Sequence, residues 1–392
     1  MPYVSIIIPT RNRAKLLPFA LRSALLQTFD DIEIIVSDNA STDDTQNVAG
    51  SFDDKRIRCV LAPKALSMPD SWEFALSQAK GEWIALLADD CFLFPHTISF
   101  ALQELKKFRA YIVAWKFCIY FDPSWIEPAR KNLVYIPKTS GKSFMVQSSK
   151  NIQKLYRIDE KVSDIMPKSL NTLIHRSLVE KIIKRQKRFF LPPCPDYTSA
   201  ASIMLNTQEY LFIDKPLYID GVTRSSIGAS ASFDLGPSSQ DYIKEFTEGM
   251  QDVGFLGIPT STSNIAKGLE EIKKIYGDAC PDIDMPRLIS SIADRLAKIE
   301  SNGGEVEHYW RSLHSYVKKQ PYRIQNMMKL RYIVSKNKWR LIRYIRFSQN
   351  LGWLESLRGI HILRGKRWGF NTIEECANTI ATILPLASFI HL

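Results

Sequence analysis

Two adjacent carboxylates follow a short apolar segment in the first quarter of the chain. Asp89 and Asp90 come directly after Trp83–Leu87, a run with the composition of a buried strand. Adjacent carboxylates repel each other and are costly to desolvate, and a cation beside them relieves both costs. The pair therefore predicts a metal-assisted site for a phosphate-bearing ligand.

Two further strand-like segments also end in polar residues. Val4–Ile8 runs into Pro9-Thr10-Arg11-Asn12-Arg13, and Ile32–Ser37 runs into Asp38. Open α/β sheets bind ligands outside the carboxyl ends of their strands, where these residues would meet Asp89. We therefore predict a nucleotide site formed by Pro9, Thr10, Arg11, Arg13, Asp38 and Asp89.

Each polar residue of this site has a chemical role to fill and a structural alternative. A carboxylate at Asp38 can accept from the N–H of a pyrimidine base while Thr10 satisfies a carbonyl. Alternatively, Asp38 forms an Asx-turn beside Ser41. Arg11 and Arg13 either face a diphosphate or are solvated.

Strand and helix patterns alternate through the first half of the chain. Strands are expected at Val4–Pro9, Ile32–Ser37, Arg56–Ala62, Trp83–Leu87 and Tyr111–Ile119, and helices at Ala14–Gln27, Pro69–Lys80 and Pro95–Lys107. This order predicts an α/β fold with a mostly parallel, doubly wound sheet.

The second half changes character towards helices. Residues 121–149 look irregular, and helices follow at Ile152–Arg157, Ser177–Gln186 and Asp196–Leu205, then a strand at Glu209–Tyr218. Beyond the Gly/Pro/Ser-rich stretch Ser225–Ser239, helices are expected at Gln240–Val253, Asn264–Tyr276, Met285–Ser301 and Val306–Lys319. We predict a catalytic domain of residues 1–238 and a helical, basic region of residues 239–392.

Composition excludes several classes of protein. Hydrophobic residues make up 45% and charged residues 24% of the 392 residues, which is typical of a globular protein and not of a disordered or fully membrane-embedded one. The six cysteines form no CxxC pair, which favours a reducing, cytoplasmic compartment. Met1 leads straight into a strand, so no signal peptide is expected.

Three motifs together resemble the family 2 glycosyltransferases: the segments Val4–Arg13, Val36–Asp43 and Gly81–Asp90, in this order and spacing. The likeness covers about the first 110 residues and weakens towards residue 230. It implies a GT-A fold, a nucleotide-sugar donor, inversion at the anomeric carbon and a divalent cation, Mn²⁺ or Mg²⁺. By resemblance, Asp89 and Asp90 hold the ribose and the cation. Leu87 or Ala88 stands where the family often has an additional Asp.

Inverting transfer also needs a general base for the acceptor hydroxyl. Asp196, in Pro192-Pro193-Cys194-Pro195-Asp196, lies about where the resembled family carries its catalytic carboxylate. The alternative is that Asp196 only caps a helix beginning at Tyr197. Asp164 is the second candidate base.

Two loops are candidates for donor contacts. Ser67 and Trp72 lie at the start of the third expected helix, and Arg224 and Ser225 lie in a Gly-flanked loop. The second loop is a candidate lid over the diphosphate.

The excess positive charge lies in one segment. Residues 311–367 contain 15 Lys and Arg but one acidic residue, Glu355, while the whole chain carries +11. Interleaved aromatic residues, Trp339, Tyr344, Phe347 and Trp353, suit an anionic membrane surface. No nucleic-acid motif accompanies them. The alternative is a helical region that forms a homo-oligomer.

The function expected from these features is inverting, metal-dependent sugar transfer from a UDP-sugar to a glycan or lipid-linked acceptor in surface polysaccharide synthesis. We expect it in the cytoplasm, at the inner face of the cell membrane. One alternative is a sugar-nucleotide nucleotidyltransferase, although Pro9–Arg13 lacks the glycine of a phosphate loop. The other is an inactive, glycosyltransferase-like binding protein.

Overall fold

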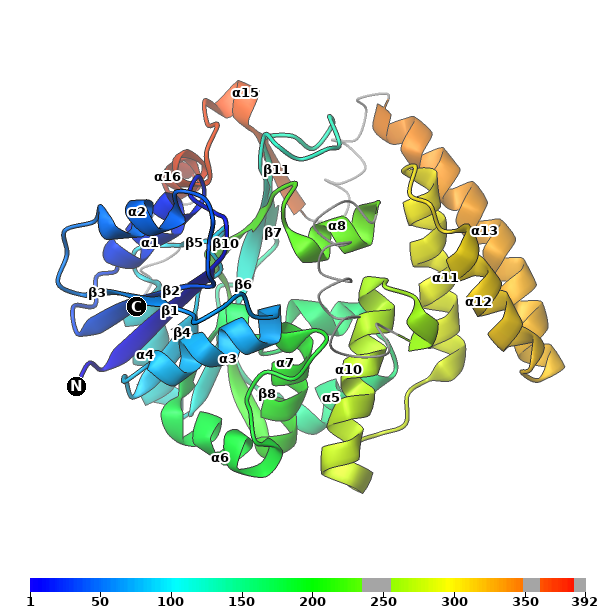
Figure 1. The fold of residues 1–392 in the computed structure, drawn as a ribbon, viewed down its shortest axis with the longest axis horizontal. Coiled ribbons are helices and arrows are strands. Elements are labelled where there is room, and N and C mark those ends of the chain that lie inside the picture. The colour runs from blue at the N-terminus through cyan, green and yellow to red at the C-terminus, as the bar shows by residue number, and fades with distance from the viewer. Residues whose placement is uncertain (235–254, 348–359, 384–392) are drawn as a thin grey trace.

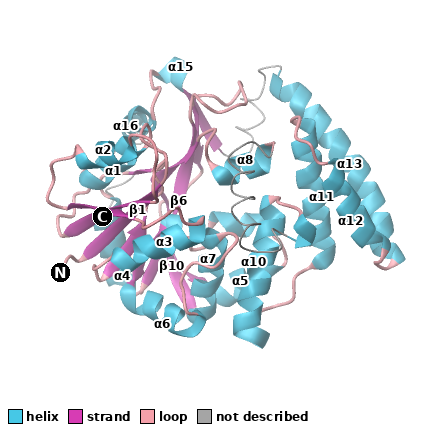
Figure 2. Ribbon diagram, in the orientation of Figure 1, coloured by secondary structure: helices cyan, strands magenta, loops and turns pink. Residues whose placement is uncertain are grey.

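The structure, a computed structural model, describes residues 1–234, 255–347 and 360–383. An α/β body is flanked by a group of long helices, α10 to α13 (Figures 1 and 2). One sheet is built from β1 (Val4–Thr10), β2 (Ile32–Asp38), β3 (Ile57–Leu61), β4 (Trp83–Leu86), β5 (Phe92–Leu93), β6 (Ile112–Phe121), β7 (Leu133–Pro137), β8 (Ser143–Gln147), β9 (Thr172–His175), β10 (Glu209–Val222) and β11 (Ile360–Arg364).

The helices of the body are α1 (Leu17–Leu25), α2 (Thr45–Gly50), α3 (Met68–Gln78), α4 (Thr97–Phe108), α5 (Ser148–Tyr156), α6 (Arg176–Gln186), α7 (Pro195–Asn206) and α8 (Ile227–Phe233). The later helices are α10 (Ser261–Tyr276), α11 (Met285–Ser301), α12 (Glu307–Lys318), α13 (Tyr322–Phe347), α15 (Gly365–Trp368) and α16 (Ile373–Ile383). Short 3₁₀ turns occur at Glu160–Asp164, Ser169–Asn171, Phe255–Gly257 and Gly277–Ala279.

The α/β prediction is confirmed, and the first strands pair in parallel as expected. β1 lies between β2 and β4, and Thr10 is the register partner of Asp38. The backbone N–H of Leu87 donates to the carbonyl of Ile7 at 2.9 Å. The carboxyl ends of these three strands therefore meet at one edge of the sheet.

The far half of the sheet is antiparallel in most of its pairings, which the sequence patterns did not predict. β9 inserts between β4 and β6 and pairs antiparallel with both. It has only four residues, too few to display a period of two. β7 and β8 form within residues 121–149, a segment whose sequence pattern looks irregular.

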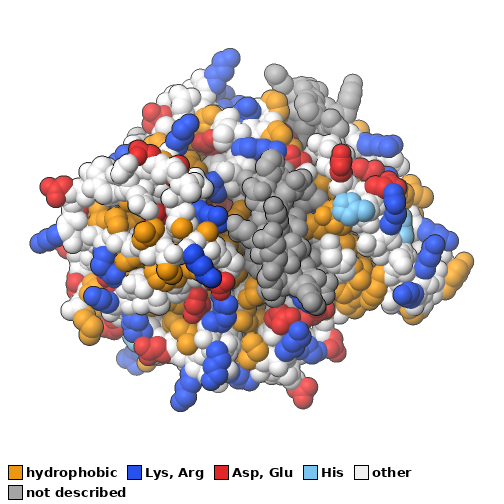
Figure 3. Space-filling model, viewed as in Figure 1, with side chains coloured by type: hydrophobic (Ala, Val, Ile, Leu, Met, Phe, Trp, Pro, Cys, Tyr) orange, Lys and Arg blue, Asp and Glu red, His pale blue; other side chains and the backbone are white. Residues whose placement is uncertain are grey.

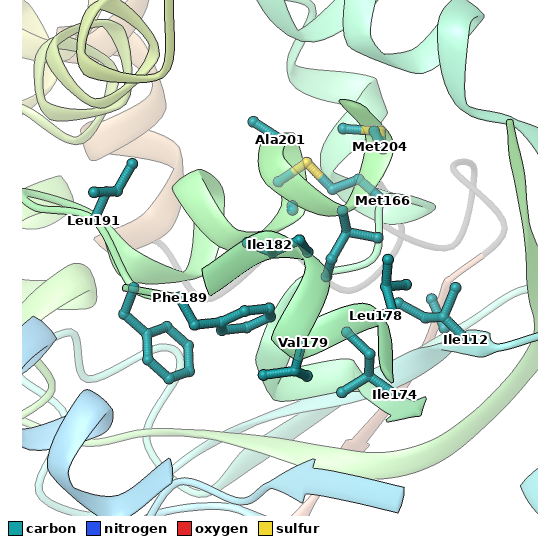
Figure 4. Packing of buried hydrophobic residues seen from close by; sticks show 14 of the residues in the cluster. Ile112, Met166, Ile174, Leu178, Val179, Ile182, Phe189, Leu191, Ala201 and Met204 are labelled. Atoms are coloured by element: carbon teal, nitrogen blue, oxygen red, sulfur yellow. The ribbon is translucent and has the colours of Figure 1, made fainter. Parts of the chain in front are cut away.

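Helices cover both faces of the sheet, because its central strands carry apolar side chains on both sides. Along β1, Ile6 and Ile8 pack with α1, α2 and α4, whereas Ile7 packs with the opposite layer of α3, α5, α6 and α7. Figure 4 shows the second layer, in which Ile182 and Val179 of α6 lie near Met166 and Ile174.

The later helices form their own core. α11, α12 and α13 gather around Leu288, Ile292, Leu296 and Leu313, each fully buried. The boundary predicted at residue 238 and the helix predicted at Gln240–Val253 lie outside the described residues. In the described ranges, no helix has the length and apolar character needed to cross a membrane.

Residues 360–383 return to the α/β body. β11 pairs antiparallel with β7, and α16 packs beside α1, β5 and β10. Phe370 is fully buried against Tyr120, and Arg22 of α1 forms an ion pair with Glu374 at 3.0 Å. The end of the basic segment is thus part of the sheet rather than of a separate helical region.

Candidate active site

A cavity of about 1070 Å³ opens at the carboxyl edge of β1, β2 and β4. Its walls come from the ends of β1 and β10, the Asp89–Asp90 turn, and the first turns of α3, α7, α8 and α10. The predicted site residues that line it are Pro9, Thr10, Arg11, Arg13, Trp72, Asp89, Asp90, Asp196 and Ser225. Asp38, Ser67 and Arg224 are not among its lining residues.

Arg13 faces the first carboxylate of the pair. Its Nε lies 3.6 Å from Oδ1 of Asp89, and both side chains are largely buried. Burial raises the pKa of Asp89 to about 7, with a further rise from Asp90, against the lowering effect of Arg13. The single positive charge of Arg13 therefore does not offset the burial and mutual repulsion of Asp89 and Asp90.

A third carboxylate, Asp220 near the end of β10, joins the pair. The Cys91 thiol lies 3.7 Å from an oxygen of Asp90 and 3.5 Å from one of Asp220. Burial raises the pKa of both carboxyls, that of Asp220 to about 6, and the charge of Asp90 adds to the effect on Asp220. Sequence reasoning missed Asp220, although a strand end followed by Gly221 was a usable signal.

These residues suit a divalent cation. Mg²⁺-type sites commonly use one or two carboxylates and complete their shell with substrate phosphates and water. Asp90 and Asp220 supply two hard oxygen donors whose raised pKa values a cation would reverse. Within the described ranges, no cluster of three His, Cys, Asp or Glu side chains is assembled as a metal cage.

Asp38 forms the Asx-turn that was one of its two predicted roles. One carboxylate oxygen, Oδ1, accepts from the backbone N–H of Ser41 at 3.1 Å and from the Ser41 hydroxyl, forming the Asx-turn. The other, Oδ2, is buried and accepts no hydrogen bond from the described residues. The Asx-turn therefore uses only one of the two carboxylate oxygens of Asp38.

The loop before α3 is fixed by a residue that sequence reasoning did not select. Asn39 donates to the carbonyl of Leu66 and accepts from its N–H, both at 2.8 Å. Ser67 caps α3 and its hydroxyl donates to Asp70 at 2.6 Å. The cap leaves Trp72, one turn later, in the cavity wall.

The loop after β10 is tied to the paired carboxylates. Arg13 Nη2 donates to the carbonyl of Ser225 at 2.7 Å, and Ser226 Oγ donates to Asp90 Oδ2 at 2.7 Å. The Arg224 side chain instead pairs with Asp234 at 3.0 Å. In this structure Ser225, and not the guanidinium of Arg224, faces the site.

Asp196 lies in the first turn of α7, which begins at Pro195 and has Cys194 at its N-cap position. It is therefore not the N-cap residue of a helix starting at Tyr197. Burial raises the pKa of Asp196, and the charge of Lys168 opposes this. The second candidate base, Asp164, is exposed and is not a cavity-lining residue.

Lys168 is a cation acting on Asp196 that sequence reasoning overlooked. Its Nζ donates to Ser163 Oγ at 3.1 Å and lies over the rings of Phe117 and Tyr197. Burial lowers its pKa, but the acidic groups around it, including the carboxylates of Asp196, Asp220 and Asp164, outweigh burial and raise the pKa of Lys168. Lys168 therefore remains a cation among the carboxylates of α7 and β10.

A further wall comes from α10, on the helical side of the molecule. Ser261, Asn264 and Ile265 line the cavity, and Asn264 Oδ1 is buried without a hydrogen-bond partner among the described residues. α10 is held close to α7 at Gly268, where a Cβ would lie 2.7 Å from Thr198 Cγ2. An unpaired amide oxygen is thus fixed beside the helix that carries Asp196.

Comparison with known proteins identifies the first part of the chain. Residues 5–182 match the family model described as Glycosyl transferase family 2. A Campylobacter jejuni protein named GalNAc(5)-diNAcBac-PP-undecaprenol beta-1,3-glucosyltransferase is 38% identical over 115 residues, 29% of this chain and 37% of that protein. An Escherichia coli UDP-Glc:alpha-D-GlcNAc-diphosphoundecaprenol beta-1,3-glucosyltransferase is 39% identical over 90 residues, 23% of this chain and 36% of that protein.

The chain thus spans little more than a third of the length of these curated relatives. Among solved structures, Staphylococcus aureus TarS 1-349 in complex with UDP-GlcNAc superposes with a TM-score of 0.50 at 15% identity. The superposition covers 86% of this chain and 90% of TarS 1-349. This likeness extends the shared fold beyond residue 182.

Proposed function

Because residues 5–182 form a glycosyltransferase family 2 domain, we propose that the chain transfers a sugar from a UDP-sugar to a hydroxyl of a glycan or lipid-linked acceptor, with inversion at the anomeric carbon. The observation that carries the proposal is the meeting of Asp89, Asp90 and Asp220 with Arg13 in a cavity that Asp196 also lines. Three carboxylates with raised pKa values beside one arginine suit a diphosphate ligand that binds together with a divalent metal ion.

In this proposal, Asp90 and Asp220 would hold Mn²⁺ or Mg²⁺, and the ion would supply positive charge to the diphosphate leaving group. Arg13 adds positive charge beside Asp89, and Asp89 accepts from the ribose hydroxyls. The free oxygen of Asp38 accepts from the N–H of the base. Together these contacts would orient the donor with its diphosphate beside Asp90 and Asp220.

Asp196 is the proposed general base. It takes the proton from the acceptor hydroxyl as that oxygen attacks the anomeric carbon and the nucleoside diphosphate leaves. Asn264 and Ser261, on the α10 wall beside α7, are proposed to hydrogen-bond hydroxyls of the acceptor sugar. Relatives named for undecaprenol-linked acceptors support a lipid-linked acceptor, which would place the enzyme in the cytoplasm at the inner membrane face.

Thermal stabilisation by nucleotides tests donor binding. UDP with Mn²⁺ should raise the melting temperature more than GDP, CDP or UDP with EDTA, since a ligand at 100 times its Kd stabilises by about 2.7 kcal/mol. Nucleotide sugars that stabilise the protein are then tested for hydrolysis and transfer. If UDP raised the melting temperature equally with Mn²⁺ and with EDTA, donor binding would not depend on a metal ion.

The base is tested by a matched pair of variants. Asp196→Asn should bind UDP normally but transfer at least ~100-fold more slowly, the usual scale for loss of a general base. Asp164→Asn should retain near-normal turnover, because its carboxylate lies outside the cavity wall. The reverse result would assign the base to Asp164.

A further inference from the structure

The exposed face of α13 carries a stripe of aliphatic side chains. Leu330, Ile333, Val334 and Leu341 are 65%, 57%, 47% and 60% exposed. At 100° per residue these four positions fall on one face of the helix, which also carries the exposed Asn326 and Asn337. The opposite face, with Met328, Tyr332, Ser335 and Trp339, packs towards α11 and α12. The stripe is therefore an outer surface of a helix that is already anchored on its other side.

Basic side chains border this stripe. Lys329 and Arg340 lie along one flank, Arg331 along the other, and Arg323 near the start of the helix; all four are exposed. None of the four forms an ion pair in the described part of the chain. Residues 308–354 contain no Asp or Glu. Figure 3 shows basic and hydrophobic side chains side by side on the outer rim formed by α12 and α13.

We propose that this face of α13 docks on an anionic lipid bilayer, with its aliphatic stripe in the interface and its basic flanks at the headgroups. An interfacial helix needs an apolar face bordered by Lys and Arg, which is what the exposed side of α13 presents. The inference concerns a surface outside the active site, and it agrees with a lipid-linked acceptor without depending on it.

The surface differs from the one that the sequence predicted. Trp339, expected among the headgroups, turns inward and packs in the core between α11 and α13. Lys336 and Lys338 form ion pairs with Glu300 and Asp294 of α11, so their charges are already partly neutralised within the protein. The side chains of Tyr344 and Phe347 and all of Trp353 lie outside the described residues.

Charge and side-chain type favour lipid over other occupants. In a two-fold contact between copies, the basic flanks would face each other with no carboxylate on the helix to pair them. Nucleic acid is held by basic residues with stacking aromatic rings, whereas the exposed apolar side chains Leu330, Ile333, Val334 and Leu341 are aliphatic. Acyl chains and anionic headgroups satisfy both parts of the surface.

Vesicle co-sedimentation of the full chain tests the proposal. The protein should sediment with phosphatidylglycerol-containing vesicles, less so in high salt, and only weakly with phosphatidylcholine alone. The variant Leu330→Gln/Ile333→Gln/Leu341→Gln should lose at least about 10-fold in binding, because its apolar contact is removed. Arg331→Gln/Arg340→Gln should lose about 5-fold per charge.

Matched controls use exposed residues elsewhere. Leu26→Gln/Ile126→Gln removes apolar side chains of similar exposure, and Lys150→Gln/Lys154→Gln removes two exposed charges of α5. Both control variants should sediment like the wild type, and UDP affinity should be unchanged in every variant. Unchanged UDP affinity shows that the variants fold, and it separates this test from the proposed activity.

Three outcomes would overturn the inference. The first is failure of the wild type to bind anionic vesicles at low salt, and the second is binding of the stripe variant equal to that of the wild type. A dimer seen by ultracentrifugation that dissociates in the stripe variants would assign the face to a second copy of the chain.

Discussion

Gly221 brings the backbone of β10 against the carbonyl of Asp90: a Cβ at position 221 would lie 1.7 Å from that oxygen. This contact holds Asp220, the preceding residue, beside Asp90. The pairing of the two carboxylates depends on a residue without a side chain.

Gly221→Ala should therefore damage the metal site more than the fold as a whole. The backbone must move to admit the methyl group, and overpacking of this kind destabilises a protein by about 1–3 kcal/mol. We expect Mn²⁺-dependent UDP affinity, measured by calorimetry, to fall at least ~10-fold. Gly50→Ala is the control, because a Cβ there meets nothing within 4 Å. Equal UDP affinity in both variants would argue against the pairing of Asp90 with Asp220.

Asp220→Asn should weaken metal-dependent UDP binding yet stabilise the protein in EDTA at pH 8. Burial raises the pKa of this carboxyl to about 6, above its ordinary value of 3.8. The unfolded chain therefore releases the proton first, and the native state loses stability as pH rises from about 4 to about 6. Asn mimics the protonated form, so its advantage should be full above pH 6 and vanish below pH 4.

Melting temperatures of wild type and variant, measured in EDTA from pH 4 to pH 8, check this sign. Saturating Mn²⁺ should reverse the order at pH 8, because only the wild type keeps both oxygen donors. A variant that melts below the wild type at pH 8 in EDTA would contradict an unneutralised carboxylate at this position.

The site residues that the sequence predicted are those that directly follow a recognisable strand. Asp38, Asp89 and Asp90 each follow a recognisable apolar run, and parallel pairing brings such ends together. Asp220 also follows an expected strand, but the strand pattern does not place it beside Asp90, because β10 reaches the site through two register shifts against β6. The return of β11 to the sheet likewise depends on pairing with β7, more than 220 residues earlier.

Lys168→Met should move the acid limb of the pH–rate profile to higher pH. The cation lowers the pKa of Asp196, which burial raises, so removing it leaves the base protonated to a higher pH. Lys168 also faces Asp164, Asp220 and Tyr197, so UDP affinity is measured in parallel to detect indirect effects. Lys168→Arg should restore the wild-type profile, and Lys184→Met, an exposed charge on α6, should not shift it. An unmoved acid limb in Lys168→Met would show that this charge does not act on the base.

Asn264→Leu should impair the acceptor side of the reaction and leave the donor side intact. The substitution keeps the volume of the side chain but removes the buried amide oxygen, and one hydrogen bond contributes about 0.5–1.5 kcal/mol. We therefore expect the acceptor KM to rise about 2- to 10-fold, with unchanged UDP affinity and unchanged donor hydrolysis in the absence of acceptor.

Thr262→Val is the matched control on the same helix, because Thr262 contacts Ser291 of α11 and does not line the cavity. Its acceptor KM should equal that of the wild type. A parallel loss of donor hydrolysis in Asn264→Leu would mean that this residue contacts the transferred sugar, and the α10 wall would then belong to the donor.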